Sequence, residues 1–151
     1  GHVGDAAGSV EGNSVLDDPA KYYTDPEQAL DFATRTGVDA LAIAVGTAHG
    51  HYKAKPKLDF DRIEKIASLL SIPLVLHGGS GLSDSDFRTT IARGISKVNI
   101  FTDINTAAAT AASAALGNGK TALTDLIPGE VDAVEAAVTE KLKLFGSTGR
   151  A

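Results

Sequence analysis

The 151-residue chain contains no cysteine, no methionine and no tryptophan. Without cysteine there can be no disulfides and no thiolate metal ligands, so any metal site must use histidine and carboxylate side chains. The lack of cysteine also agrees with a cytoplasmic protein, which is the location we expect. Without methionine the sequence does not start at a natural initiator, and we expect Gly1 to be a processed, tagged or truncated start.

The chain also has no excess of basic residues and no long apolar run. Its formal net charge of −5 argues against a nucleic-acid or membrane-surface partner. The apolar runs are far shorter than a membrane span, and the first residues lack the basic start and apolar core of a signal peptide. With 43% hydrophobic and 22% charged residues, the composition is that of a globular protein long enough for one domain.

Three apolar runs, residues 39–45, 73–77 and 97–101, predict strands. The first has no polar alternation, which is typical of a strand covered on both faces in a parallel sheet. Between and after these runs, apolar residues recur at helical spacing. The predicted helices begin after the caps Asp25 and Ser83, near Phe60, near Asp103 and near Pro128, and end near Gly37, Leu70, Gly94, residue 116 and Gly146. The stripe expected to face inward on the last helix is Val131, Val134, Val138, Leu142 and Phe145.

Strands that alternate with helices of this size indicate right-handed parallel βα units. Three complete strands are too few for an open sheet or a barrel, and a full eight-fold barrel needs about 250 residues. We therefore predict an α/β fold that is the C-terminal half of a TIM (β/α)8 barrel. The chain is expected to be a single, incomplete domain over 1–151, with a mobile loop over 4–24, βα units over 25–116 and a C-terminal helix over 128–146.

Two histidines, His49 and His77, follow consecutive predicted strands. Function collects at the carboxyl ends of parallel strands, and two neutral imidazoles that converge there suit Zn²⁺. The alternative is that each histidine caps strand backbone or supports this rim through hydrogen bonds. We expect His2 and His51 to be surface or loop residues.

A glycine-rich turn, Gly78-Gly79-Ser80-Gly81, joins a predicted strand to a capped helix. Its backbone N–H groups and the Ser80 hydroxyl can cradle a phosphate, although an ordinary tight βα turn is the alternative. Asn99 and Thr102 end the last predicted strand, and barrel phosphate sites commonly use the last two strand loops. Further candidates are Lys53 as a cation for an anionic ligand, Asp103 as a helix cap, and Asp5 or Glu11 as a general acid or base if their loop closes over the site.

The motifs Ala-Val-Gly-Thr-Ala-His-Gly (44–50), Pro-Leu-Val-Leu-His-Gly-Gly-Ser-Gly (73–81) and Lys-Val-Asn-Ile (97–100) occur in this order. Together with Tyr52-Lys53 and the ending Phe145-Gly146-Ser147, they resemble the class II, zinc-dependent ketose-bisphosphate aldolases. The resemblance covers the C-terminal half of that family's barrel. It implies an enzyme of carbohydrate metabolism, a lyase of the glycolytic type, that cleaves fructose or tagatose 1,6-bisphosphate to dihydroxyacetone phosphate and glyceraldehyde 3-phosphate.

The resemblance also implies roles for individual residues. His49 and His77 resemble two of three zinc ligands, and backbone near Gly50 and Gly78 resembles a monovalent-cation (Na⁺ or K⁺) site. Asn99 resembles the contact to the dihydroxyacetone phosphate part of the substrate. The residues that resemble substrate and phosphate contacts are Gly50, Lys53, Gly78, Gly79, Ser80, Asn99 and Thr102.

Parts of the family pattern are missing or altered. The third zinc-ligating histidine and the neighbouring aspartate base lie upstream in the family, and the acid-bearing loop is diverged, so either Asp5 or Glu11 would supply the acid. Phe101 stands where some members have an acidic residue, so the sugar stereochemistry is not carried over. We expect little or no aldolase activity from the chain alone, and a homo-oligomer (a dimer or larger) that covers unpaired strand edges. The alternatives are a non-catalytic phosphate-binding or assembly module and, less favoured because of the two histidines, another phosphate-handling barrel such as an isomerase.

Overall fold

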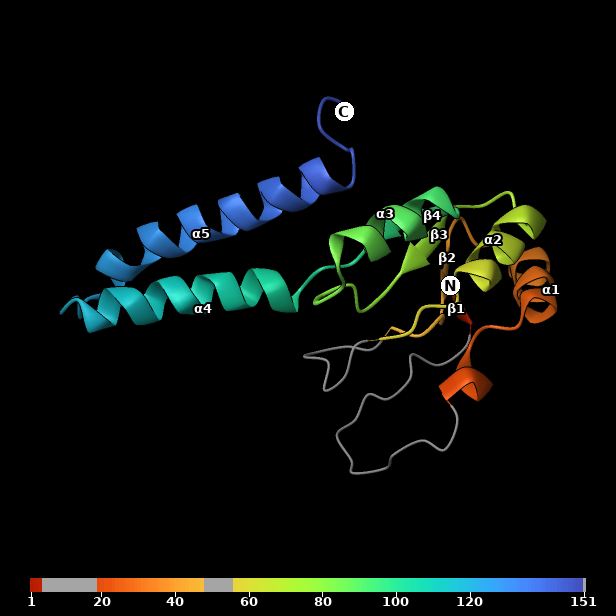
Figure 1. Ribbon diagram of the computed structural model, residues 1–151, viewed down its shortest axis with the longest axis horizontal. Coiled ribbons are helices and arrows are strands. Elements are labelled where there is room, and N and C mark those ends of the chain that lie inside the picture. Colours follow the sequence, from red (N-terminus) through yellow and green to blue (C-terminus); the bar gives the residue numbers. More distant parts are fainter. Residues whose placement is uncertain (4–18, 48–55, 151) are drawn as a thin grey trace. The chain divides into compact units, whose positions relative to one another are not determined.

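The computed structural model describes residues 1–3, 19–47 and 56–150, and these form two compact units, Gly1–Ile100 and Phe101–Ala151. Each unit is described by itself (Figure 1). The first unit contains β1 (His2–Val3), the 3-10 helix η1 (Pro19–Tyr22), α1 (Pro26–Thr36), β2 (Leu41–Ile43), α2 (Phe60–Leu69), β3 (Leu74–Leu76), α3 (Asp84–Ala92) and β4 (Ile95–Val98). The second contains α4 (Thr102–Gly117) and α5 (Leu123–Leu144).

The four strands of the first unit form one parallel sheet in the order β1-β2-β3-β4. Helices connect the consecutive strands, so the predicted α/β fold with parallel βα units is confirmed. Among the described residues, β1 and β4 each pair on one side only, which leaves two open edges. The sheet therefore has four parallel strands in sequence order, the number expected for half of an eight-stranded barrel.

Strand register separates the two faces of the sheet. Leu41, Leu74 and Ile95 lie side by side on neighbouring strands and are at most 3% exposed. The next row is Ala42, Val75 and Lys97, which points to the opposite face because side chains alternate along a strand. A Cβ added to Gly1 would lie 2.5 Å from Cε1 of Phe32 in α1. Gly1 and Val3 are two residues apart and so point to the same face of the sheet, and Val3 pairs with Ile43. The face that carries Ile43 is therefore the one toward α1.

A bulge in β4 changes the alternation expected from the sequence. Ile95 pairs with Leu74, but Lys97 pairs with Val75, so Ser96 is an extra residue in the ladder. The predicted strand 97–101 is wrong in its boundaries, because the observed strand is Ile95–Val98. A regular strand would place Ile95 and Lys97 on one face, whereas the bulge places them on opposite faces.

The helix caps predicted at Asp25, Gly37 and Ser83 are confirmed. The Asp25 carboxylate accepts hydrogen bonds of 3.0 Å from the backbone N–H groups of Glu27 and Gln28, and Gly37 ends α1 in the left-handed region. Ser83 and Asp86 form a reciprocal capping box at the start of α3. The predicted mobile loop over 4–24 falls mainly on 4–18, outside the described residues, but residues 19–22 form a 3-10 helix instead.

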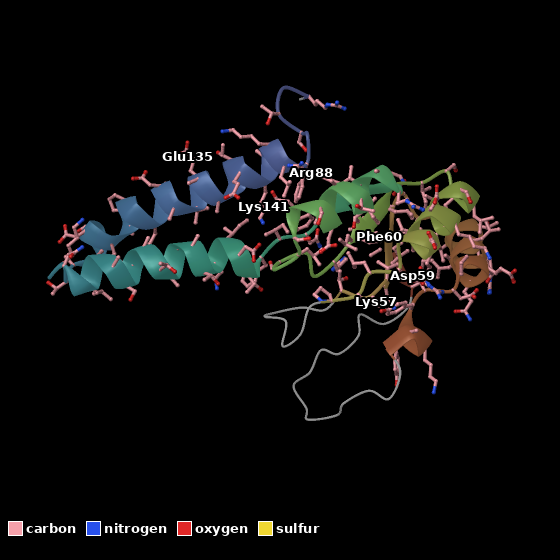
Figure 2. The ribbon with its side chains drawn as sticks, viewed as in Figure 1. Lys57, Asp59, Phe60, Arg88, Glu135 and Lys141 are labelled. Atoms are coloured by element: carbon pink, nitrogen blue, oxygen red, sulfur yellow. The ribbon has the colours of Figure 1, made fainter. Side chains whose placement is uncertain are left out.

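In the second unit, α4 and α5 lie side by side as an antiparallel pair (Figure 1). Lys141, labelled in Figure 2, lies near the end of α5. It forms an ion pair of 3.2 Å with Asp103 in the first turn of α4. The expectation that Asp103 caps α4 is wrong, because the N-cap position is Phe101 and Asp103 lies inside the helix.

The predicted start of the last helix at Pro128 is also wrong, because α5 begins at Leu123 and contains Pro128. An internal proline removes one backbone hydrogen bond, and the other bonds of this 22-residue helix are enough to continue through it.

The stripe predicted to face inward on the last helix is partly exposed. Val131 is 56% exposed and Leu142 is 46% exposed. Ile127 and Leu123, one and two turns before Val131, are 44% and 67% exposed. Val134, Val138 and Phe145 are half-buried, and no residue of α5 is fully buried. No helix among the described residues is both long and apolar enough to cross a membrane.

Candidate functional site

His77 and Asn99 lie side by side just beyond the ends of β3 and β4. The Asn99 N–H donates to the Leu76 carbonyl at 3.0 Å, and the Gly79 N–H donates to the Asn99 carbonyl at 3.2 Å. The first bond extends by one residue the register in which Val98 pairs with Leu76, so His77 lies opposite Asn99. The second bond comes from Gly79 where a regular ladder would use Gly78, so regular pairing ends at His77. Their side chains leave the same face of the sheet, which is the face of Val75 and Lys97. The two strands therefore bring an imidazole and a carboxamide together.

The glycine-rich turn begins directly after His77. Gly78 and Gly81 have φ values of 65° and 83°, in the left-handed region that favours glycine. Gly79 is closely packed: a Cβ there would lie 2.8 Å from Val98 Cγ1 and 2.9 Å from Ile100 Cδ1, so these side chains would have to shift. The turn is therefore tied closely to the end of β4, and it leads into the capped N-terminus of α3. This is the strand-turn-helix setting in which backbone N–H groups bind anions.

Ser80 is only 6% exposed, so it is buried within the turn. The prediction that its hydroxyl contacts a phosphate stays a prediction. Thr102 is the first residue of α4, in the second unit. Asp5, Glu11, His49, Gly50, His51 and Lys53 lie outside the described residues. The described part of the site is therefore His77, the glycine-rich turn and Asn99. Among the residues that the structure describes, no group of three or more histidine, aspartate or glutamate side chains could hold a metal ion.

A second cluster, which the sequence did not reveal, joins the ends of β1 and β2. The Thr24 hydroxyl donates to the Val3 carbonyl and accepts from the Ala44 N–H at 2.7 Å. The Thr24 N–H donates to the Ala44 carbonyl at 2.9 Å. Thr24 is fully buried, and these bonds fix the point at which the chain returns after residues 4–18. A threonine in an expected loop gives no signal in the sequence for this role.

Arg62 in α2 holds this cluster in place. Its guanidinium donates to the Thr24 carbonyl at 3.0 Å and pairs with the Asp59 carboxylate at 2.9 Å. It also lies over the Tyr23 ring, 5.7 Å from the centroid. The Asp59 N–H in turn donates to the Val45 carbonyl at 3.0 Å, and Figure 2 shows Asp59 next to Phe60 where α2 begins. One side chain therefore connects the returning ends of both segments, 4–18 and 48–55, that carry the other predicted site residues.

We expect Arg62→Met to lower the free energy of unfolding by about 1–2 kcal/mol, because it leaves the Asp59 carboxylate and the Thr24 carbonyl without this charged donor. Urea unfolding followed by circular dichroism measures the change. Arg35→Met is the matched control, since the Arg35–Asp31 pair is exposed and should contribute no more than about 0.5 kcal/mol. Equal losses in the two variants would contradict a special role for Arg62.

The cavities of the first unit lie away from this site. One of about 810 Å³ is lined mainly by α1, including Phe32 and Arg35. Another of about 640 Å³ is lined by residues that include Tyr23, Lys57 and Arg93. Neither is lined by His77 or Asn99, which are both half-buried. We therefore place the candidate site by chemistry and register.

The arrangement of a histidine, a glycine-rich turn and an asparagine at the ends of parallel strands agrees with a comparison to protein-family models. Residues 1–150 match the model of the class-II fructose-bisphosphate aldolases. The chain belongs to this family. The family membership that the sequence motifs predicted is thereby confirmed.

Individual relatives of this aldolase-family chain give the same result. Protein YdjI of Escherichia coli (strain K12) is 44% identical over 130 residues, which cover 86% of this chain and 46% of YdjI. The crystal structure of the YdjI aldolase superposes with a TM-score of 0.79 over 87% of this chain and 48% of that chain. The chain thus spans about half the length of the relatives it matches.

Two further solved structures extend the comparison. A candidate fructose-1,6-bisphosphate aldolase from Coccidioides immitis has a TM-score of 0.83 and 28% identity, covering 99% of this chain and 52% of that chain. Fructose-bisphosphate aldolase from Campylobacter jejuni has a TM-score of 0.67 over 90% of this chain and 48% of that chain. At 21% identity, the second likeness shows the fold alone. All three structures are matched over about half their length, which agrees with half a TIM barrel.

Proposed function

We propose that this chain is the C-terminal half of a zinc-dependent ketose-bisphosphate aldolase, with fructose or tagatose 1,6-bisphosphate as substrate. The observation that carries the proposal is the register that places His77 beside Asn99, directly before the glycine-rich turn. In a family of aldolases, this gives a metal-ligating group, a polar contact and an anion-binding turn at one rim. The proposed reaction yields dihydroxyacetone phosphate and glyceraldehyde 3-phosphate.

The donor chemistry at the end of β3 suits zinc, because the His77 imidazole is a common zinc ligand. His77 is the one proposed ligand among the described residues, and we propose His49 as the second from the sequence. When bound, zinc would act as a Lewis acid on the ketone of the substrate. Further ligands would come from outside the described residues. A monovalent cation near Gly50 and Gly78 belongs to the same proposal.

The chain's own residues would bind and orient the substrate. The N–H groups of Gly78 and Ser80 would donate to one phosphate, supported by Lys53, while the Gly79 N–H holds the turn against the Asn99 carbonyl. Asn99 would hold the dihydroxyacetone phosphate part next to His77, and fixed placement of both ends of a substrate lowers the entropic cost of reaction. Either Asp5 or Glu11 would handle a hydroxyl proton.

Zinc binding to the chain tests the metal part of this proposal. By isothermal titration calorimetry, we expect weak zinc binding that His49→Ala and His77→Ala each reduce by at least about tenfold, or about 1.4 kcal/mol. His51→Ala is the matched control and should leave the affinity unchanged. Zinc affinity that is insensitive to both His49→Ala and His77→Ala would contradict the proposed ligands.

Dihydroxyacetone phosphate tests the substrate part. In a ¹H–¹⁵N spectrum of the zinc-loaded chain, its addition should move the backbone signals of Gly78, Gly79 and Asn99 more than inorganic phosphate does at the same concentration. The difference should be lost in His77→Ala. Equal effects of the two ligands, with or without zinc, would instead support a non-catalytic phosphate-binding module.

A further inference from the structure

We propose that Lys97 is a positioning residue that fixes the carboxamide of Asn99, so that the amide NH₂ group and not the carbonyl oxygen faces the ligand. The inference rests on the proposed function in one respect, namely that Asn99 contacts the substrate. Its core concerns two side chains, that of Lys97 in β4 and that of Asn99 just after β4. That part can be tested without substrate or metal.

Register brings the two side chains together. The bulge at Ser96 places Lys97 opposite Val75, on the face away from α1. Asn99 is two residues further along and leaves the same face. The Lys97 ammonium donates a short hydrogen bond to the Asn99 side-chain oxygen Oδ1. The contact is therefore a product of strand geometry and does not depend on residues outside the described ranges.

The chemistry of the lysine settles the orientation of the amide. An ammonium group can only donate hydrogen bonds, so its partner on asparagine must be Oδ1. With Oδ1 held by Lys97, the Nδ2 amino group is turned away from Lys97. Asn99 then presents two N–H donors and cannot present its acceptor. A positive charge on the oxygen side also polarises the amide and makes these N–H groups stronger donors.

Within the described residues, the hydrogen bond to Asn99 is the side-chain contact that the structure gives Lys97. Lys97 is exposed, and its neighbours in the row, Val75 and Ala42, are apolar. Within residues 1–3, 19–47 and 56–150, Lys97 makes none of the ion pairs observed. An ammonium group placed beside apolar side chains, with an amide oxygen as its partner, orients that amide and does not neutralise an acid.

The orientation restricts what the site can bind. Two N–H donors next to His77 favour an oxygen that accepts hydrogen bonds and carries negative charge, such as a phosphate, alkoxide or enolate oxygen. A hydroxyl group that must donate to Asn99 is disfavoured, because the acceptor Oδ1 is occupied. The ligand part at Asn99 is therefore an oxyanion or an oxygen that becomes one.

The side-chain amide signals of Asn99 test the orientation in the ligand-free chain. They are assigned in the ¹H–¹⁵N spectrum by their loss in Asn99→Ser. We expect Lys97→Met, which removes the donor, to shift both amide proton signals and to broaden them as the group begins to rotate. Lys97→Arg should restore most of the original positions, because it supplies a donor again. Lys65→Met on the exposed side of α2 is the matched control and should leave these signals in place.

A measurement on the unmutated chain keeps the test independent of how the variants fold. A coupling through the hydrogen bond between Lys97 Nζ and Asn99 Cγ should be detectable, and its absence together with unchanged amide signals in Lys97→Met would overturn the proposal. A second readout is affinity for dihydroxyacetone phosphate in the zinc-loaded chain. Lys97→Met should weaken it about tenfold, or about 1.4 kcal/mol, and Lys97→Arg should recover it. If the amide signals respond but the affinity does not, the orientation holds and the assignment of Asn99 to the substrate fails.

Discussion

Replacing Gly46 with alanine is expected to lower the free energy of unfolding by about 3 kcal/mol or more. Gly46 has a φ of 109°, where a side chain strains the backbone by about 1–3 kcal/mol. The new Cβ would also lie 2.4 Å from the Lys57 carbonyl oxygen and 2.7 Å from the Tyr23 hydroxyl oxygen. The first of these is backbone, and it cannot move without disturbing the start of α2, so the two costs add.

Gly37→Ala separates strain from overlap. Gly37 also has a positive φ, 63°, but an added Cβ would meet nothing within 4 Å. Its loss should therefore be limited to about 1–2 kcal/mol of backbone strain. Urea unfolding of both variants gives the comparison. Similar losses in the two would show that the close approach of Lys57 to Gly46 does not constrain the fold.

Phe87→Ala is expected to cost about 3–5 kcal/mol, the usual range for removing a fully buried aromatic ring. Phe87 is 0% exposed and is the largest fully buried side chain of the first unit. It lies in α3, the helix that the glycine-rich turn leads into. Its loss should therefore loosen the turn as well as lower global stability. Phe101→Ala, at a ring that is 74% exposed, should change the free energy of unfolding by about 0.5 kcal/mol or less.

Chemical unfolding and amide hydrogen exchange together test the second part of this expectation. Exchange at Gly79 and Leu82, whose N–H groups bond to Asn99 and Gly79 carbonyls, should accelerate in Phe87→Ala. An unchanged exchange rate at both positions, after allowance for global stability, would mean that the turn does not depend on how α3 packs.

The sequence predicted the local elements of the first unit well, because their signals are local. An aspartate or serine before an apolar period marks a helix start, and both Asp25 and Ser83 make the expected bonds. The strand cores were found because apolar runs fully buried in a parallel sheet are distinctive. The placement of His77 and the glycine-rich turn at a strand end followed from these two kinds of signal.

Features that depend on distant partners were not predictable in this way. Arg62 bonds to Thr24, which is 38 residues away, and nothing near either residue indicates the contact. The start of α5 was placed too late because proline is usually a boundary, whereas Pro128 lies inside that helix. Lys97 and Asn99 share a face because they are two residues apart, but the extra residue Ser96 decides which face that is, and nothing in the sequence marks this bulge.

The bulge at Ser96 has a consequence for the comparison of related chains. Ser96 has no pairing partner on β3. Ile95 pairs with Leu74 and Lys97 pairs with Val75, and these two partners are adjacent in sequence. Removing Ser96 would leave the same two pairings in a regular ladder. The strand can therefore vary in length by one residue while Lys97 and Asn99 keep the same face of the sheet. An alignment that allows no gap within this strand would match Lys97 and Asn99 to the wrong positions in a relative without the bulge.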